Sequence, residues 1–321
     1  MMTTYGFHAS HEQISPGRLL RDVQQAERAG FRIAMCSDHF SPWSTRQGHS
    51  GFAWSWLGAA LATTDMTFGT VCAPGQRYHP AVVAQSSATL AEMFPDRFWV
   101  ALGSGQNMNE HITGDKWPDK ATRQARLEES VDVIRRLHRG EEVTHHGLVD
   151  VENARVYSLP ETPPRIMGPA LTPETAARAA HWADGLITIN DDPDSVRQII
   201  RSYRTAGGRG TLALQVHVAI EDTMSRAREV ARDQWQNHAV DPPVAYDLPT
   251  PEEFDLVARY IPDEKIEETV IVTDSVDHLV GRLREFEELG FDEIYLHHVS
   301  QDQAGFLELA EQELLPALAR G

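Results

Sequence analysis

Short runs of apolar and β-branched residues alternate along the chain with longer amphipathic stretches. We interpret eight of the runs as strands, at residues 5–9, 31–37, 67–73, 98–104, 165–170, 184–190, 212–220 and 293–299. The stretches between them have the pattern of helices with one buried face. Residues 15–30 are an example, because Ser15 and Pro16 are typical of a helix N-terminus and Gly30 of the position after its end.

This alternation predicts the fold class. Strands that alternate with helices in units of about 30 residues indicate right-handed βαβ units and a parallel sheet. Eight such units close into a (β/α)8 TIM barrel, which is the α/β fold we expect. The alternative is an open doubly wound sheet, but the first strand is not followed by the GxGxxG turn typical of that fold.

Three segments interrupt the repeat, and we interpret them as insertions after the fourth, fifth and seventh strands. They cover residues 108–120, 140–164 and 237–268. The middle segment alternates like a β-hairpin around "THHGLVDV", and the last is rich in proline and acidic residues. No boundary of a second domain stands out, so we expect one domain over residues 1–321.

The charge of the chain favours a small-molecule substrate. A net charge of −18 opposes binding to nucleic acid or to anionic membranes, because both need a basic surface. Cys36 and Cys72 have no metal-ligand spacing and form no disulfide framework, so we expect two buried free cysteines and no metal site. The N-terminus has no signal-peptide pattern, and we expect a cytoplasmic protein.

Polar residues directly after the strands are candidates for function, because a barrel of this kind carries its active site at the carboxyl ends of its strands. Asp38, His39 and Trp43 follow the second strand. An imidazole beside a carboxylate can act as a general base, although a structural histidine at the rim is the alternative. Trp43 could wall off a flat ligand, whereas we expect Trp54 and Trp56 in the core of the next helix.

Two turns could approach a ligand. The run "GSGQNMNE" at 103–110 leaves the fourth strand through two glycines, which lets the backbone come close to a ligand. The run "ALTPETAARAA" at 170–180 opens like a helix with Thr172 as N-cap and Pro173 in the first position. Free N–H groups there could hold a phosphate, but Glu174 opposes it, and a plain capped helix is the alternative.

Six motifs occur in the order and at the spacing of a known family. They are "ASHEQISP", "SDHFSPW", "GFAWSWLGAAL", "GTVCAPGQRYHPAVVAQ", "GSGQNMNEHITG" and "LEESVDVIRRL". Nearly the whole chain resembles the luciferase-like flavin and deazaflavin oxidoreductases, in the branch that contains the glucose-6-phosphate dehydrogenases dependent on coenzyme F420. The resemblance implies a TIM barrel with insertions and a cofactor that is F420 or, alternatively, FMN. We also expect a homodimer.

The resemblance further implies the residues of the site. Those expected to line the cofactor pocket are Asp38, Val71, Cys72, Ala73, Gly105 and Asn109, together with Gly168, Ala170, Thr172 and Thr175 of the turn "GPALTPETA". Val71–Cys72 falls where the family has a non-prolyl cis peptide bond behind the ring. His39, Trp43 and Glu12 match the family's active-site histidine, tryptophan and glutamate.

Two departures from the family pattern change the expected reaction. Gln106 stands where the dehydrogenases have an acidic proton donor, and an amide cannot supply a proton. The regions that match the family's basic phosphate ligands read "TINDDP", "PEEFDLVARY" and "EETVIVTD", and their carboxylates would repel a phosphate. At the pocket mouth, where the acidic tail of F420 would prefer basic residues, we find Arg46 and Arg77.

We therefore expect an oxidoreductase that transfers a hydride between F420 or FMN and a small organic substrate. Reduction of a polarised double bond is the expected reaction, and oxidation of glucose 6-phosphate is not. In this reaction His39 handles the proton, and Gln106 orients the substrate by hydrogen bonding. The alternatives are a non-catalytic flavin-binding protein of the same fold and an FMN-dependent monooxygenase.

Overall fold

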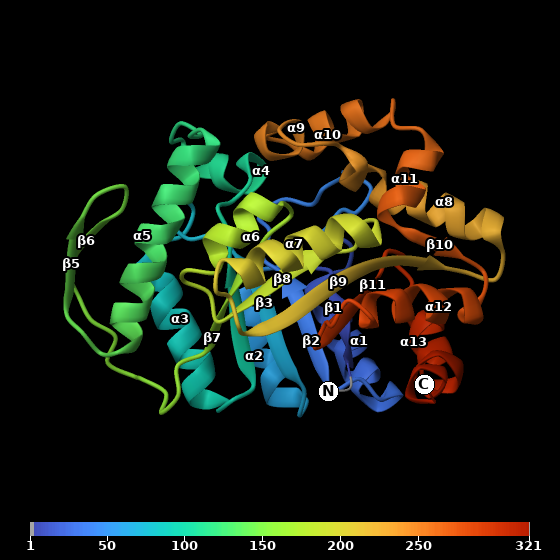
Figure 1. Ribbon diagram of the computed structural model, residues 1–321, viewed down its shortest axis with the longest axis horizontal. Helices are drawn as coiled ribbons and strands as arrows, with labels where there is room; N and C mark the ends of the chain where they lie inside the picture. The colour runs from blue at the N-terminus through green and yellow to red at the C-terminus, as the bar shows by residue number, and fades with distance from the viewer. Residues whose placement is uncertain (1–2, 321) are drawn as a thin grey trace.

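The computed structural model describes residues 3–320, in which parallel strands close into a barrel (Figure 1). In order around the barrel the strands are β1 (Thr4–Ala9), β2 (Ile33–Ser37), β3 (Thr67–Cys72), β4 (Phe98–Leu102), β7 (Arg165–Pro169), β8 (Gly185–Ile189), β9 (Thr211–Ile220) and β11 (Glu293–His298). The pairings of β8 with β9 and of β11 with β1 close the sheet. The predicted TIM barrel is confirmed, and all eight predicted strands occur.

Helices surround the barrel; most of them connect successive strands, and the last two follow β11. They are α1 (Pro16–Ala29), α2 (Ala53–Thr63), α3 (Pro80–Met93), α5 (Lys120–His138), α6 (Pro173–Ala179), α7 (Pro193–Thr205), α8 (Met224–Trp235), α12 (Val276–Glu287), α13 (Ala304–Leu309) and α14 (Leu315–Ala319). The predicted bounds of α1 are confirmed: Ser15 precedes Pro16, and Gly30 follows the helix with φ of 116°. Among residues 3–320, no helix is both long and apolar enough to cross a membrane.

The three insertions lie outside this repeat. The first forms α4 (Asn107–Glu110) and a 3₁₀ turn (His111–Thr113), and the second forms an antiparallel hairpin of β5 (Val143–His146) and β6 (Asp150–Ala154). The third contains a 3₁₀ helix (Gln236–Ala239), α9 (Val244–Asp247), α10 (Pro251–Ala258) and α11 (Asp263–Thr269).

Two expectations about these connections need correction. The hairpin does not follow the fifth barrel strand, because it lies between α5 and β7, which is that strand. A further short strand, β10 (Ile271–Thr273), pairs in parallel with Val218–Ile220 at the end of β9. Three residues are too few to show a periodic pattern, so the sequence did not reveal it.

Apolar side chains fill the middle of the barrel. This inner cluster consists of Met35, Trp99, Ala101, Met167, Ile187, Ala213 and Tyr295. A Cβ on Gly69 would overlap the indole of Trp99, so glycine at this point of β3 makes room for the largest ring of the cluster. The filled interior leaves open space beyond it, at the two ends of the barrel.

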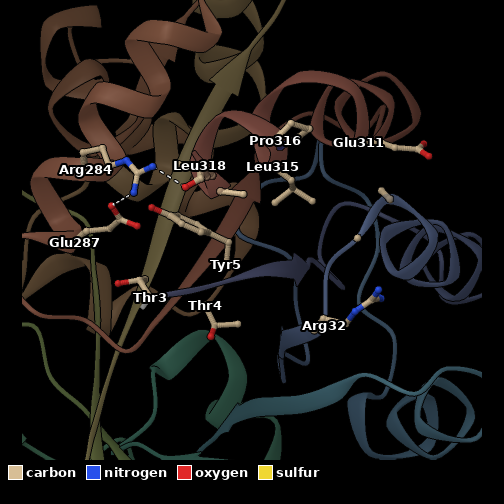
Figure 2. A pocket seen from close by; sticks show the side chains of 13 residues that line it. Thr3, Thr4, Tyr5, Arg32, Arg284, Glu287, Glu311, Leu315, Pro316 and Leu318 are labelled. Atoms are coloured by element: carbon tan, nitrogen blue, oxygen red, sulfur yellow. Dashed lines mark hydrogen bonds and ion pairs between the residues drawn. The ribbon is translucent and has the colours of Figure 1, made fainter. Parts of the chain in front are cut away.

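The cavity at the amino ends of the strands has a volume of about 720 Å³ (Figure 2). Arg284 on its wall donates hydrogen bonds to the Glu287 carboxylate and to the carbonyl oxygen of Leu318. The Arg284 guanidinium is therefore already paired with groups of the protein. The larger cavity lies at the opposite end.

The fit of Trp99 against Gly69 predicts the cost of a single methyl group. Gly69→Ala should lower the free energy of unfolding by about 3 kcal/mol, the upper end of the usual cost of overpacking, because the new Cβ displaces a ring that has no free space around it. Urea unfolding followed by circular dichroism measures the change.

Gly281→Ala is the matched control. Gly281 lies on α12, and a Cβ there would meet nothing within 4 Å. Alanine should therefore raise the free energy of unfolding by about 0.5–1 kcal/mol through its better helix propensity. Equal stability of the two variants would contradict the tight fit at Gly69.

Candidate active site

A cavity of about 970 Å³ opens at the carboxyl ends of the barrel strands. It is lined by twelve of the residues expected in the site: Glu12, Asp38, His39, Trp43, Val71, Cys72, Ala73, Gly105, Gln106, Asn109, Thr172 and Thr175. These come from the ends of β1, β2, β3 and β4 and from the turn after β7. The parallel barrel thus brings residues from five separate connections to one space.

Gly168 and Ala170 do not line this cavity, contrary to our expectation. A Cβ on Gly168 would lie 2.6 Å from the Cβ of Ala179, so this glycine allows α6 to pack closely on β7. Ala170 is buried in the apolar cluster between strands and helices. Both residues serve packing.

His39 lies beside the buried carboxylate of Glu12, which is in the loop after β1. Its Nδ1 is 3.3 Å from Oε1 of Glu12. The other carboxylate oxygen of Glu12 accepts hydrogen bonds from the hydroxyl groups of Ser10, at 3.0 Å, and Ser37, at 2.6 Å. Glu12 is 2% exposed, so this pair is shielded from solvent.

The environment keeps His39 neutral and Glu12 ionised at neutral pH. Burial lowers the pKa of His39, and Arg77 lowers it further, which outweighs the opposite effect of the Glu12 charge. Burial alone would raise the pKa of Glu12, but His39 and the Ser37 hydroxyl hold it below its usual value. A neutral imidazole facing an ionised carboxylate can take up and return a proton.

Asp38 is not the partner of His39, although the two are adjacent in the sequence. Asp38 lies 3.5 Å from the guanidinium of Arg77 and accepts a hydrogen bond of 3.1 Å from the Tyr78 hydroxyl. Neighbouring residues at a strand end point in different directions, so Asp38 and His39 meet different groups. Arg77 also contacts Glu110, with Nε 3.6 Å from Oε1, and is held between the two carboxylates.

Burial is the largest influence on the pKa values of the carboxylates around Arg77. It raises the pKa of Asp38 and of Glu110, and the nearby Arg77 opposes the rise at both sites. Burial also raises the pKa of the Cys72 thiol well above its ordinary value, so Cys72 is a neutral thiol and not a nucleophile. Cys36 and Cys72 are both buried and free, as predicted.

The wall beside β3 and β4 is built from small side chains. Cys72, Ala73 and Gly105 line it, and Gly105 has φ of 81°, in the left-handed region. A Cβ on Gly105 would come within 3.1 Å of Glu110 and 3.4 Å of Ala73. The turn therefore needs glycine, which keeps this side of the cavity flat.

The expected cis bond at Val71–Cys72 does not occur. Within residues 3–320 the cis peptide bond is Pro242–Pro243, and Val71–Cys72 is trans. β3 continues as a regular strand to Cys72, which pairs with Leu102 of β4. A regular ladder up to this residue accounts for the extended trans backbone.

Asn109 and Gln106 line the cavity next to Gly105 and are joined by a hydrogen bond. The Asn109 side-chain oxygen accepts hydrogen bonds from the backbone N–H groups of Phe40, at 2.9 Å, and Ser41, at 3.3 Å. Its amide nitrogen donates to Oε1 of Gln106 at 3.5 Å. Gln106 lines the cavity, and its NH₂ group makes no hydrogen bond to another residue in the described part of the chain.

The N-cap prediction for α6 is confirmed. The Thr172 hydroxyl accepts a hydrogen bond of 3.3 Å from the N–H of Thr175, and the two hydroxyl groups lie 3.0 Å apart. Pro173 occupies the first turn. The cap already uses the Thr175 N–H group, which favours the plain capped helix.

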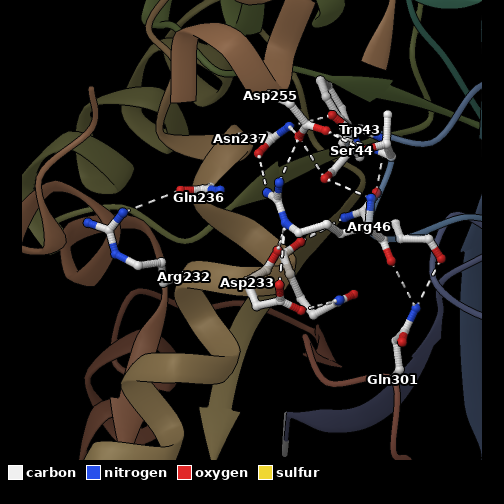
Figure 3. Close-up of polar contacts among 12 residues, drawn as sticks. Trp43, Ser44, Arg46, Arg232, Asp233, Gln236, Asn237, Asp255 and Gln301 are labelled. Carbon is white, nitrogen blue, oxygen red and sulfur yellow. Dashed lines mark hydrogen bonds and ion pairs between the residues drawn. The ribbon is translucent and has the colours of Figure 1, made fainter. Parts of the chain in front are cut away.

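A polar network fixes the loop that carries Trp43 (Figure 3). The Asp255 carboxylate of α10 accepts hydrogen bonds from Ser44, at 2.7 Å, and from Asn237, at 3.1 Å, and pairs with Arg46 at 3.2 Å. Asn237 also donates to the backbone oxygen of Trp43. Arg46 therefore belongs to this network, and it is not a basic group at the cavity mouth.

The basic groups at the mouth come from α5. Lys120 and Arg123 line the cavity, and the Arg123 guanidinium lies 4.5 Å above the ring of Trp117. Asp247 of α9 accepts a hydrogen bond of 3.1 Å from Trp117 Nε1 and lies 3.9 Å from Arg123. Sequence reasoning did not place Arg123 and Asp247 at the site, because Arg123 follows the first irregular insertion and Asp247 lies within the third.

Sequence reasoning also missed most of the side of the cavity near β9. Gln215, His217, Trp235 and His238 line it together with His8. The alternation in "LALQVHVAI" could have revealed part of this side, because it places Ala213, Gln215 and His217 on one face of a strand.

Comparison with known proteins identifies the family. The model of the luciferase-like monooxygenases matches residues 1–293. The chain belongs to this family. The predicted resemblance is confirmed. Trp54 and Trp56 lie buried on α2, the helix after the second strand, as predicted.

Individual luciferase-like relatives match over nearly their whole length. An F420-dependent glucose-6-phosphate dehydrogenase of Beutenbergia cavernae is 34% identical, over 99% of this chain and 98% of the relative. The solved structure of an F420-dependent secondary alcohol dehydrogenase with an F420-acetone adduct has a TM-score of 0.91 at 29% identity, covering 99% of each chain. The F420-dependent tetrahydromethanopterin reductase of Methanopyrus kandleri, at a TM-score of 0.78 and 19% identity over 99% of this chain and 100% of that chain, shows the same fold.

The contact between His39 and Glu12 predicts a shift of the His39 titration. Glu12 raises the pKa of His39 while burial lowers it, so Glu12→Gln removes the raising effect and should move the His39 pKa further below 6.5. Histidine NMR signals followed against pH in the wild type and the variant measure both values.

Glu129→Gln is the matched control. Glu129 lies 2.9 Å from His145, away from the cavity, and its replacement should leave the His39 titration unchanged. A His39 pKa that rises or stays constant in Glu12→Gln would contradict the electrostatic coupling.

Proposed function

We propose that this protein is an F420-dependent oxidoreductase that reduces a polarised double bond in an uncharged small molecule. The observation that carries the proposal is the buried pair of neutral His39 and ionised Glu12, which opens on the 970 Å³ cavity. The F420-dependent relatives that match 98–99% of this chain at 30–34% identity support the choice of cofactor.

The residues of the cavity fit such a cofactor. Cys72, Ala73 and Gly105 offer a flat wall for a tricyclic ring, and a side chain at Gly105 would fill that space. Lys120 and Arg123 would attract the acidic tail that distinguishes F420 from FMN. When bound, F420 supplies the hydride.

His39 is placed to handle the proton that accompanies hydride transfer. Reduction of a C=O or C=N bond adds a hydride to carbon and a proton to the heteroatom. His39 would first take up a proton from solvent, then deliver it to the heteroatom and return to its neutral form, while Glu12 stabilises the charged imidazole in between. In the reverse direction the neutral ring is the base.

Gln106 and Trp43 would complete the site. The free NH₂ group of Gln106 can donate a hydrogen bond to a substrate oxygen or nitrogen, which polarises the double bond. Trp43 packs edge-on against Phe254, with ring centroids 5.4 Å apart, and excludes water from the reacting atoms.

Glucose 6-phosphate does not suit this cavity. The side of the cavity near β9 has only neutral side chains among its lining residues. A phosphate dianion would find no cation there.

Absorbance of the purified protein, alone and titrated with F420 or FMN, tests the proposal. We expect binding of F420, and oxidation of its reduced form under anaerobic conditions by enones, imines or ketones. Glucose 6-phosphate should not reduce the bound cofactor. Preferential binding of FMN would overturn the cofactor, and saturable reduction by glucose 6-phosphate with a KM of about 1 µM–1 mM would overturn the substrate class.

His39→Ala should lower turnover by about 10²-fold, the usual contribution of a general acid or base, and leave F420 affinity unchanged. In the wild type, kcat/KM for the oxidation direction should fall only in acid, below the ordinary histidine pKa of 6.5, because burial lowers the His39 pKa. Stopped-flow absorbance of the cofactor measures both effects.

His181→Ala, a change at an exposed histidine after α6, is the control and should behave as wild type. Undiminished turnover in His39→Ala would remove His39 from the mechanism.

A further inference from the structure

Four ring side chains form one side of the cavity and take no part in the steps above. We name His8, His217, Trp235 and His238 the histidine wall. The ring centroid of His217 lies 4.4 Å from that of His238 and 5.1 Å from that of Trp235. The four residues come from β1, β9, the end of α8 and the following 3₁₀ helix.

Strand alternation directs two of these rings into the barrel. Gly6 of β1 faces Tyr295 of the inner cluster, and His8 comes two residues later. His217 comes four residues after Ala213, another member of that cluster. Residues at even separations share one face of a strand, so both imidazoles lie above the filled middle of the barrel.

The histidine wall holds polar atoms without partners. Nδ1 of His8, Nδ1 of His217 and Nε1 of Trp235 have no hydrogen-bond partner within the described residues. Their residues are 4%, 1% and 4% exposed. Burying such atoms unpaired is costly, and a ligand that hydrogen-bonds to them removes that cost.

The histidine wall carries no charge at neutral pH. Burial lowers the pKa of His8 and of His238 to about 4, and lowers that of His217 well below its usual value. The cavity's basic residues lie elsewhere, with Arg77 between two carboxylates and Lys120 and Arg123 on α5. A charged ligand group would find no counter-ion at the wall.

The rings are also unsuited to a metal ion. Within residues 3–320, no three histidine, cysteine, aspartate or glutamate side chains are grouped so that they could hold one. The unpaired nitrogen atoms and the ring faces instead match an organic ligand with both apolar surface and an oxygen atom.

We propose that the histidine wall is the substrate subsite and that it binds an uncharged group bearing a second carbonyl or hydroxyl oxygen, away from the reacting bond. The location of this subsite rests on the proposed function, because Trp43 lies between His39 and the histidine wall. Its ring lies 5.1 Å from His39 and 6.3 Å from His238. Trp235 Nε1 donates to the ligand oxygen, and the imidazoles donate or accept.

Calorimetric titration of the protein with oxidised F420 tests the subsite, since ketones cannot be reduced in that state. Three probes share one ring: cyclohexanone, cyclohexane-1,4-dione and 4-oxocyclohexanecarboxylate. The dione should bind about 3–10-fold more tightly than cyclohexanone, the effect of one net hydrogen bond. The carboxylate should bind no better than cyclohexanone.

Two variants remove the polar atoms but keep an aromatic ring. Trp235→Phe and His217→Phe should each reduce the preference for the dione. His298→Phe is the matched control, because His298 is equally buried, has an unpaired Nδ1 and stacks on Phe306 outside the cavity. Circular dichroism confirms that each variant is folded.

The outcomes separate this proposal from the proposed function. If both folded variants keep the preference, or if the carboxylate binds most tightly or no probe binds at millimolar concentration, the subsite is wrong. If the preference depends on Trp235 and His217 but the chromophore titration shows FMN, the subsite stands and the cofactor proposal fails. If F420 binds and is oxidised by ketones without this preference, only the subsite fails.

Discussion

Closure of the parallel sheet is the constraint on which the site depends. Hydrogen bonds between β8 and β9 and between β11 and β1 join the ends of the sheet, so every barrel strand delivers its carboxyl end to the same rim. The rings of Trp99 and Tyr295 fill the interior below that rim. The polar residues beyond them therefore share one cavity, although they are spread over more than 200 positions of the sequence.

Removal of water decides the charges inside this cavity. The same burial raises the pKa of Asp38 and Glu110 and lowers the pKa of His39 and His217. Glu12 is the exception, because His39 and Ser37 together outweigh its burial. The result is an ionised Glu12 beside a neutral His39 imidazole, and uncharged rings where a substrate would extend.

Hydrophobic periodicity was sufficient to predict the barrel, because each strand is an apolar run that alternates with a helix. It could not reveal β10, which has three residues, or the place of the hairpin relative to β7. The candidate site was predicted where a residue directly follows a strand, as for Glu12, His39 and Gln106.

Contacts between distant residues were beyond sequence reasoning. Because Asp38 and His39 are adjacent in the sequence, Asp38 was the expected carboxylate partner of the imidazole. In the structure Asp38 contacts Arg77, and Glu12 is the partner of His39. Trp235 and His238 looked like parts of a helix and an insertion, and only the closed barrel brings them beside Trp43. Arg46 was expected at the cavity mouth, yet the folded insertion holds it against Asp255.

The two sides of the cavity opening are held by contacts of different kinds. Asp255 is buried and binds Ser44, Thr45 and Asn237, so it links the loop of Trp43 to the third insertion. On the other side of the opening, the exposed carboxylate of Asp247 on α9 lies 3.9 Å from the guanidinium of Arg123 on α5 and accepts a hydrogen bond from Trp117 in the loop before α5. Because water competes for the exposed Asp247 carboxylate, this contact adds less stability than the buried Asp255 network, and Trp43 lies on the better-held side of the opening.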